Sequence, residues 1–206
     1  MTTIVQPAIQ HLQVNDSVIA ALIATYPTPE ITKHDNYYQE LVESIIGQQL
    51  SVKAARTIRG KFVELFGGNF PNPEEILARD VEELRSVGLS RPKASYIQDL
   101  ALKVIEGEIK FDELDSLSND AIIAELTKVK GIGVWTVHMF LMFCMARLDV
   151  LPTGDLGIRN GIMKLYALDH LPEPREIELL AETNGWQPYA SVASLYIWKS
   201  LDNMPH

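Results

Sequence analysis

An aspartate follows a turn-forming sequence in the segment 152–155, Pro-Thr-Gly-Asp, and directly precedes a helical pattern. Ile158, Ile162 and Leu165 mark one face of that pattern, so Asp155 is predicted at or next to the N-cap of a helix. The helix dipole and backbone N–H donors hold a carboxylate at such a position ionised. A fixed anion of this kind can stabilise positive charge that develops on a reacting group. The alternative is that Asp155 only caps the helix.

A second segment with chemical potential is 126–136, Leu-Thr-Lys-Val-Lys-Gly-Ile-Gly-Val-Trp-Thr. Its periodicity predicts two helices joined by a tight turn. Gly131 and Gly133 leave the turn free of Cβ atoms, so amide N–H groups at the start of the second helix can face outward. Exposed amides at a helix N-terminus attract an anion such as phosphate, and Lys128 and Lys130 add charge beside them. The alternative is a glycine-rich turn between two core helices.

The charge balance limits how the protein can meet a polyanion. A net charge of −9 and a pI near 5.0 argue against binding nucleic acid through the overall field. Net charge does not describe distribution, however, and the basic residues gather in three groups. Any affinity for nucleic acid is expected to be modest and to fall with salt; the alternative for each group is a solvated helix face. The groups are Lys53, Arg56, Arg59 and Lys61; Arg91 and Lys93; and Lys128 and Lys130.

Cysteine usage and hydropathy exclude several classes of protein. Cys144 is the only cysteine, so an internal disulfide, a cysteine-rich zinc site and a four-thiolate iron–sulfur cluster are excluded. No set of His, Asp and Glu has the spacing of a catalytic metal site, and nothing suggests a redox or nucleotide cofactor. Residues 1–14 lack a charged region leading into a long apolar stretch, and no apolar run reaches about 18 residues. We therefore expect a soluble, cytosolic protein without a membrane partner.

The spacing of apolar residues predicts an all-α protein. Intervals of three and four recur along most of the chain, and the capping patterns of residues 72–75 and 80–83 mark helix starts. We expect about ten helices joined by short turns. Strand signals are weak, and the only candidates are Ile4-Val5 and Glu108 to Phe111.

The 206 residues are interpreted as one unit, 1–206, built of two lobes. One lobe, about 36–146, contains the glycine-rich segment, whose second helix is predicted over 135–146. The other lobe, about 1–35 plus 147–206, contains the helix predicted over 156–168 after Asp155.

Four blocks of sequence, in the same order, resemble the helix–hairpin–helix DNA glycosylase superfamily of base excision repair. They are 45–55 (IIGQQLSVKAA), 126–136 (LTKVKGIGVWT), 151–159 (LPTGDLGIR) and 186–198, which begins WQPY and ends YIW. Within the superfamily they look like the alkylation-repair branch, that of 3-methyladenine DNA glycosylase II. The resemblance covers about residues 36–200, and the extra N-terminal β-domain of some members does not fit before it, so we expect a short form.

The resemblance implies an all-α, two-lobed enzyme with a DNA-binding cleft. The implied reaction is hydrolysis of the N-glycosidic bond of alkylated purines, such as 3-methyladenine or 7-methylguanine, after the base is flipped out of duplex DNA. Asp155 matches the aspartate that faces the sugar and stabilises the positive charge forming there. The implied partner is double-stranded DNA with damaged bases, and a monomer without a required cofactor is expected. Its location would be the cytoplasm, with the nucleoid, in a prokaryote, or the nucleus in a eukaryote.

Trp135 distinguishes the reaction subtype. Relatives that also cut the DNA strand carry a lysine directly after Gly-x-Gly-x and use it to form a Schiff base. An indole cannot be that nucleophile, so the resemblance implies a monofunctional enzyme that uses water. Trp135 and Trp198 match aromatic positions of the base pocket, where electron-rich rings favour cationic alkylpurines; the alternative for both is core packing. Met139 replaces a tyrosine found at the pocket in some members.

Further DNA contacts are implied by the same resemblance. Gln49 matches the residue that fills the space left by the flipped base, where the best-known relative has leucine; the alternative is a polar turn. Backbone phosphate would be bound at the hairpin, with Lys53, Arg56, Arg91 and Lys93 as further candidates. Hairpin carbonyls in the family can hold a simple cation (Na, K or Mg), and the matching positions are Thr127, Val129 and Ile132.

Two other interpretations stay open from the sequence. A noncatalytic helix–hairpin–helix module would bind DNA without needing Asp155 or the aromatic pair. A glycosylase for another lesion, such as mismatched adenine or uracil, would keep Asp155 but need a different pocket. His138, on an apolar helix, is predicted to be a partly buried histidine rather than a base.

Overall fold

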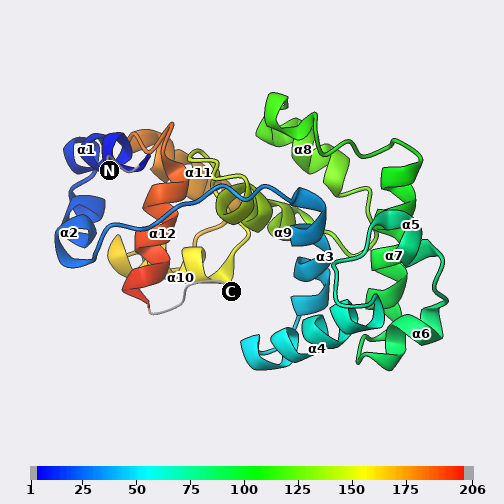
Figure 1. Cartoon of the computed structure of the whole chain (residues 1–206). Coiled ribbons are helices and arrows are strands. Elements are labelled where there is room, and N and C mark those ends of the chain that lie inside the picture. Colours follow the sequence, from blue (N-terminus) through cyan, green and yellow to red (C-terminus); the bar gives the residue numbers. More distant parts are fainter. Residues whose placement is uncertain (1–3, 202–206) are drawn as a thin grey trace. The chain divides into compact units, whose positions relative to one another are not determined.

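The computed structural model describes residues 4–201 of the chain. Across these residues the secondary structure consists of twelve α-helices, one 3-10 turn and one π-helical segment, without any strand (Figure 1). The all-α prediction is confirmed, and the two strand candidates are wrong. Ile4 and Val5 form a turn before the first helix. The amides of Glu108 and Ile109 both donate to the carbonyl of Lys103, so this segment caps a helix instead of pairing in a sheet.

The chain divides into two compact units, and each is described by itself. Unit 1 consists of Met1–Lys33 with Leu141–His206, and unit 2 is His34–Phe140. The helices of unit 1 are α1 (Gln6–Asn15), α2 (Ser17–Thr25), α10 (Leu156–Leu165), α11 (Pro174–Thr183) and α12 (Ala190–Ser200). Those of unit 2 are α3 (Tyr37–Gly47), α4 (Val52–Leu65), α5 (Pro73–Leu77), α6 (Val81–Ser86), α7 (Arg91–Ile105), the 3-10 turn η1 (Leu114–Ser116), α8 (Asn119–Leu126) and α9 (Val134–Met139). None of the described helices is long and apolar enough to span a membrane.

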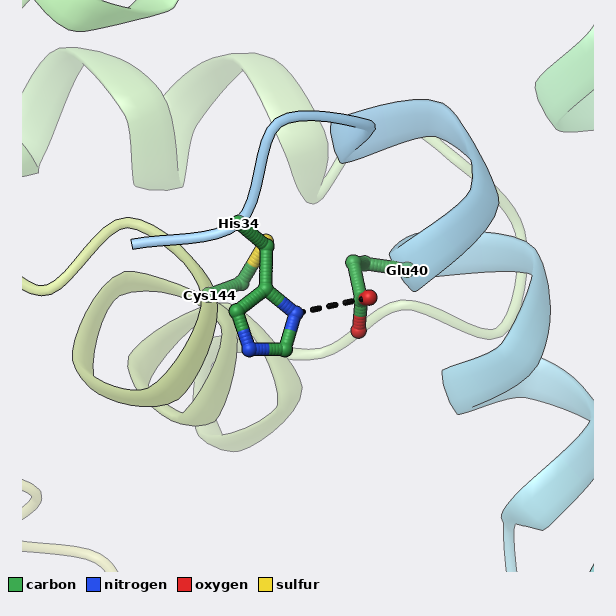
Figure 2. Close-up of side chains that lie close together, drawn as sticks. All are labelled: His34, Glu40 and Cys144. Atoms are coloured by element: carbon green, nitrogen blue, oxygen red, sulfur yellow. Dashed lines mark hydrogen bonds and ion pairs between the residues drawn. The ribbon is translucent and has the colours of Figure 1, made fainter. Parts of the chain in front are cut away.

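Side-chain caps begin most of the helices of unit 2. Asn72 and Glu75 form a reciprocal capping box at α5, and Asp80 and Glu83 do the same at α6, as the sequence pattern predicts. Before α3, His34 Nδ1 forms a hydrogen bond of 2.7 Å with Glu40 Oε1 of that helix (Figure 2). The two capping boxes satisfy amides that the first turn of a helix leaves without partners.

Helix α12 is the centre of unit 1. Nine consecutive residues, Ala190 to Trp198, are buried, and the helix contacts α1, α2 and α10. Two of these residues are serines, but Ser191 Oγ donates to the carbonyl of Arg147 and Ser194 Oγ to that of Ala190, so their burial leaves no hydroxyl without a partner. A Cβ on Gly161 of α10 would lie 2.3 Å from the side chain of Ile197. Glycine therefore permits the close approach of α10 and α12.

Helix α7 has the corresponding place in unit 2, where it contacts α3, α5 and α6. Its apolar face carries Ala94, Ile97, Leu100 and Ala101, all fully buried. The interval of three and four between these residues gives the helix one continuous apolar stripe.

Two helices end earlier than the apolar pattern predicts. The helix expected over 135–146 is α-helical only to Met139 and continues as the π-helical segment η2 (Phe140–Cys144). The helix expected over 156–168 ends at Leu165 because Ala167 adopts φ +51° and the amide of Leu168 returns to the carbonyl of Met163. This left-handed ending satisfies carbonyls of the last turn. Periodicity reports the apolar face and does not report such a local change of hydrogen bonding.

The turn between α8 and α9 depends on Gly131. Its φ is +80°, and a Cβ would lie 2.1 Å from the ring of Tyr96 on α7. By contrast, Gly133 has φ −98° and open space where a Cβ would be. The two glycines of the hairpin are therefore not equivalent.

Gly131→Ala should lower the free energy of unfolding by about 1 to 3 kcal/mol, because it combines a left-handed backbone with a clash. Urea denaturation provides the measurement. Gly133→Ala is the matched control and should change stability by less than about 0.5 kcal/mol. Equal effects of the two substitutions would contradict this account of the turn.

Candidate active site and DNA-binding surface

Asp155 is the N-cap of α10, as its sequence context predicts. Its Oδ1 accepts a hydrogen bond of 2.8 Å from the amide of Ile158, and its own amide donates to the carbonyl of Pro152 at 2.9 Å. The residue is 9% exposed. The turn before the helix and the helix N-terminus together fix the direction of this carboxylate.

Trp198 holds the same oxygen from a second helix. Its indole Nε1 donates to Asp155 Oδ1 at 2.8 Å, and its ring stacks on Phe143 with the centroids 6.1 Å apart. The side chain is 1% exposed. This differs from the expectation that Trp198 offers a surface for stacking on a base, since burial leaves its ring almost no accessible face. In this structure Trp198 orients Asp155.

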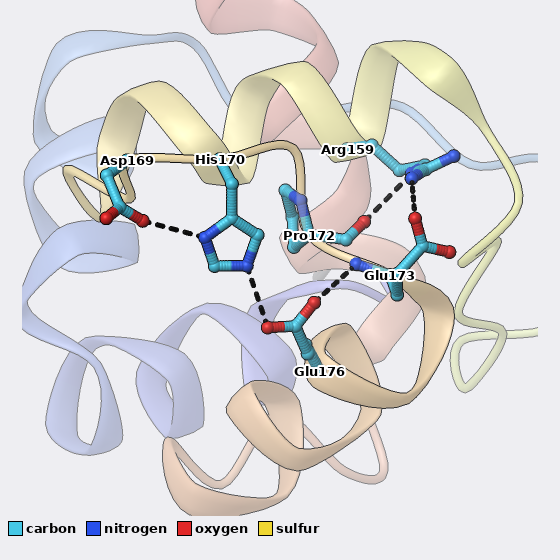
Figure 3. A network of polar contacts seen from close by, with 6 residues as sticks. All are labelled: Arg159, Asp169, His170, Pro172, Glu173 and Glu176. Carbon is cyan, nitrogen blue, oxygen red and sulfur yellow. Dashed lines mark hydrogen bonds and ion pairs between the residues drawn. The ribbon is translucent and has the colours of Figure 1, made fainter.

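A network of polar side chains anchors α10 one turn beyond Asp155 (Figure 3). Arg159 Nε donates to the carbonyl of Pro172, and its Nη2 pairs with Glu173 at the start of α11, both at 2.8 Å. His170 lies between Asp169 and Glu176, and hydrogen bonds to these two carboxylates raise the pKa of the imidazole. The sequence analysis did not predict this tie between α10 and α11.

The hairpin between α8 and α9 presents its two lysines differently. The amide of Lys130 donates to Asp99 Oδ2 at 2.9 Å, and its Nζ pairs with Asp99 Oδ1 at 3.1 Å. Lys128 is exposed and forms no ion pair with any residue in 4–201. Gly133, the N-cap of α9, provides no side chain to cap the first amides of that helix. Lys128 is therefore the stronger candidate for a phosphate contact.

The other basic candidates also separate into two kinds. Lys53, in the first turn of α4, and Arg56 are exposed and pair with no carboxylate within the described part of the chain. Arg91 forms an ion pair with Glu82, which offsets its charge. Lys93 points its ammonium at two backbone carbonyls, Ile46 O at 2.8 Å and Gln48 O at 2.5 Å. This geometry is a correction for Lys93, because its donors are directed into the protein and not toward a phosphate.

The turn after α3 presents Gln49 at its tip. Gln49 is exposed and adopts φ +58°, an uncommon conformation for a residue with a side chain. Its neighbour Gln48 reaches across to the hairpin, where Nε2 donates to the carbonyl of Gly131 at 2.8 Å. The structure thus joins two segments, 48–50 and 128–133, that the sequence predicted separately.

A protein-family model described as HhH-GPD superfamily base excision DNA repair protein matches residues 42–186. This chain belongs to that superfamily. The resemblance to this superfamily is thereby confirmed, and the match contains the first three of the four sequence blocks.

Two solved structures of HhH-GPD relatives cover nearly the whole chain. One is a 3-methyladenine DNA glycosylase of Schizosaccharomyces pombe in complex with abasic DNA, with 34% identity, a TM-score of 0.80 and coverage of 98% of this chain and 100% of the relative. The other is a DNA-3-methyladenine glycosidase of Bacillus halodurans, with 36% identity, a TM-score of 0.85 and coverage of 95% and 89%. A curated relative, the putative DNA-3-methyladenine glycosylase YfjP of Bacillus subtilis, is 36% identical to this chain. The aligned part covers 80% of this chain and 59% of the relative.

Trp135 lies in the first turn of α9, and its side chain is 45% exposed. Met139, one turn later, is half-buried. Their role in a base pocket stays a prediction. His138 is half-buried, and burial lowers the pKa of its imidazole, so it is neutral at pH 7. The expectation of a partly buried histidine is confirmed.

The sequence resemblance implies that the carbonyls of Thr127, Val129 and Ile132 are the positions that would hold a simple cation. Val129 O accepts the amide of Ile132 at 3.1 Å, which occupies only one of its two lone pairs. Neutral carbonyl oxygens suit hard cations such as Na⁺, K⁺ or Mg²⁺. These residues fit such an ion, which would bring positive charge to the hairpin, and its presence stays a prediction.

Trp198→Phe should destabilise the fold by about 2 to 4 kcal/mol, because it removes a donor from a buried carboxylate and leaves a small cavity. A double-mutant cycle with Asp155→Ala isolates the hydrogen bond and should return a coupling of about 1 to 2 kcal/mol. Urea denaturation measures both. Trp135→Phe, on an exposed tryptophan, is the control and should be nearly neutral. A coupling near zero would contradict the orienting role of Trp198.

Proposed function

We propose that this protein is a monofunctional DNA glycosylase that hydrolyses the N-glycosidic bond of alkylated purines in duplex DNA and leaves an abasic site. The observation that carries the proposal is the oriented carboxylate of Asp155, held by Ile158 and Trp198 within the segment 42–186 that matches the HhH-GPD family. The names of the two solved relatives, both 3-methyladenine enzymes, support the substrate class. The abasic DNA bound to one of them supports DNA as the partner.

The chemistry requires an anion more than it requires a proton donor. When the bond between C1′ and the base breaks, the electron pair leaves with the base and positive charge develops on the sugar. A fixed carboxylate beside the sugar stabilises that charge, and it needs little reorganisation because its hydrogen bonds already hold it. Water then adds to C1′ and releases one proton to the solvent. A cationic alkylpurine leaves as a neutral base, so no general acid is needed.

Trp135 supports the absence of strand cleavage. A lyase forms a Schiff base through a lysine amine, whereas the indole nitrogen has no available lone pair for attack on the sugar. Its exposed ring can stack on an extruded cationic base, with Met139 one turn away. We infer that these two residues contribute to the base pocket.

The DNA backbone would be bound by the hairpin amides near Gly131 and Gly133, with Lys128 and Lys53 as phosphate contacts. Gln49 would occupy the space that the extruded base leaves. We propose that the protein acts as a monomer without a required cofactor, with at most a simple cation at the hairpin. Its place would be the nucleoid in a prokaryote or the nucleus in a eukaryote.

Asp155→Asn should reduce the release of methylpurines from methylated duplex DNA by on the order of 100-fold or more, because the electrostatic stabilisation is lost. Stability and DNA binding should change little, since asparagine is an equally good N-cap. Asp80→Asn makes the same substitution at the exposed N-cap of α6 and serves as control. The assay measures free bases, and strand breaks before and after hot alkali.

In that assay, breaks should appear only after alkali. Breaks without alkali would overturn the monofunctional assignment. A parallel loss of DNA binding and base release in Asp155→Asn would mean that Asp155 is only a cap.

Lys128→Gln should reduce the slope of log affinity against log salt concentration by about 1, because one phosphate contact is removed. The affinity for abasic duplex DNA is measured between about 50 and 200 mM salt. Lys110→Gln removes an exposed lysine that is already paired with Glu113 and should leave the slope unchanged. An unchanged slope for Lys128→Gln would exclude this contact.

A further inference from the structure

Lys93, which is not part of α3, binds backbone carbonyls at the C-terminal end of that helix. Helix α3 closes at Gly47, and the last carbonyls of any helix lack partners within it. Lys93 Nζ, from the first turn of α7, donates to Ile46 O at 2.8 Å and to Gln48 O at 2.5 Å. A cation at a helix C-terminus also interacts favourably with the helix dipole. The half-buried ammonium is thus committed to the protein, and burial lowers its pKa.

The turn that Lys93 holds is itself strained. Gln49 has φ +58°, and a left-handed residue with a Cβ costs about 1 to 2 kcal/mol unless its surroundings over-determine it. Two further contacts do so: the amide of Leu50 donates to Gly47 O at 3.1 Å, and Gln48 Nε2 donates to Gly131 O at 2.8 Å. The result is a rigid turn whose tip, Gln49 with Leu50, is exposed.

The same face of α7 also supports the hairpin. Tyr96, three residues after Lys93, lies against Gly131. Asp99, three residues further, binds both the amide and the ammonium of Lys130. Residues spaced by three lie on one side of a helix. One helix face therefore sets the position of the 48–50 turn and of the hairpin, which the side chain of Gln48 also connects.

We infer that Lys93 is a positioning residue for base extrusion: it fixes the 48–50 turn relative to the hairpin, so that the exposed tip enters the duplex in a defined place. The inference rests on the proposed function. Filling the space of an extruded base with a mobile turn would cost conformational entropy at each binding event, and a turn fixed in advance avoids that cost. Lys93 acts here through the backbone and contacts no DNA.

Single-turnover release of 7-methylguanine from two duplexes tests the inference. In one, the lesion is paired with cytosine; in the other, it faces an abasic analogue and is less costly to extrude. Lys93→Met, which keeps the side-chain length and removes the donors, should slow release from the paired duplex about tenfold and from the unpaired one less than about threefold. Lys93→Arg keeps donors and should lie between Lys93→Met and the wild type.

Lys103→Met is the matched control, since Lys103 lies on the same helix and pairs with Glu108 at 2.7 Å, a residue outside the turn. It should behave as the wild type on both duplexes. Equal slowing of Lys93→Met on the two duplexes, or no slowing, would overturn the inference. A lower salt slope of binding for Lys93→Met would instead return Lys93 to the phosphate contacts.

A second readout separates this inference from the proposed function. A 2-aminopurine next to an abasic analogue reports local unstacking when the protein binds, whether or not a base is released. If the wild-type protein releases no base, the proposed function fails, and the fluorescence change still decides the role of Lys93. The change should be smaller for Lys93→Met than for the wild type and Lys103→Met; an equal change would overturn the inference. If Lys93→Met does not fold, Lys93→Gln is used in its place.

Discussion

A buried carboxylate has to be supplied with hydrogen-bond donors, and this constraint organises unit 1. Asp155 receives the amide of Ile158 and the indole N–H of Trp198. Trp198 can reach it only because α12 is packed closely against α10 at Gly161 and is buried along nine residues. The serines within α12 then need partners of their own, which they find in backbone carbonyls. One carboxylate thus explains the position of two helices.

Unit 1 contains a second buried aspartate that is held in the same way. Asp16, 2% exposed, caps α2 through the amides of Val18 and Ile19 and also accepts the indole N–H of Trp186 at 2.7 Å. The hydroxyl of Tyr166 donates to it as well. Each of the two aspartates is the N-cap of a helix, and each accepts a hydrogen bond from its own tryptophan. An aspartate in this arrangement therefore does not by itself indicate catalysis. Of the two, only Asp155 lies within the segment 42–186 that matches the HhH-GPD family.

Local signals predicted much of this molecule. The caps at Asp155, Asn72 and Asp80 follow from contacts over three residues, which a sequence displays directly. The orienting contact of Trp198 and the carbonyl contacts of Lys93 join residues more than 40 positions apart, and no pattern of spacing encodes them. The sequence does not distinguish Lys93 from Lys128, yet the ammonium of Lys93 is directed into the protein and Lys128 is exposed. The ending of α9 in a π-helical segment was missed because the apolar run continues through it.

The burial of nine consecutive residues of α12 limits which parts of the protein can vary. Each residue from Ala190 to Trp198 is buried, so few other sequences would fit this segment. A change in its packing would move Trp198 and with it the carboxylate of Asp155. Trp135, on the short α9, is 45% exposed, so its side chain is less enclosed than those of α12. For protein engineering this means that substitutions on α12 disturb the frame that holds Asp155, whereas exposed positions of α9 can be changed with less effect on the interior.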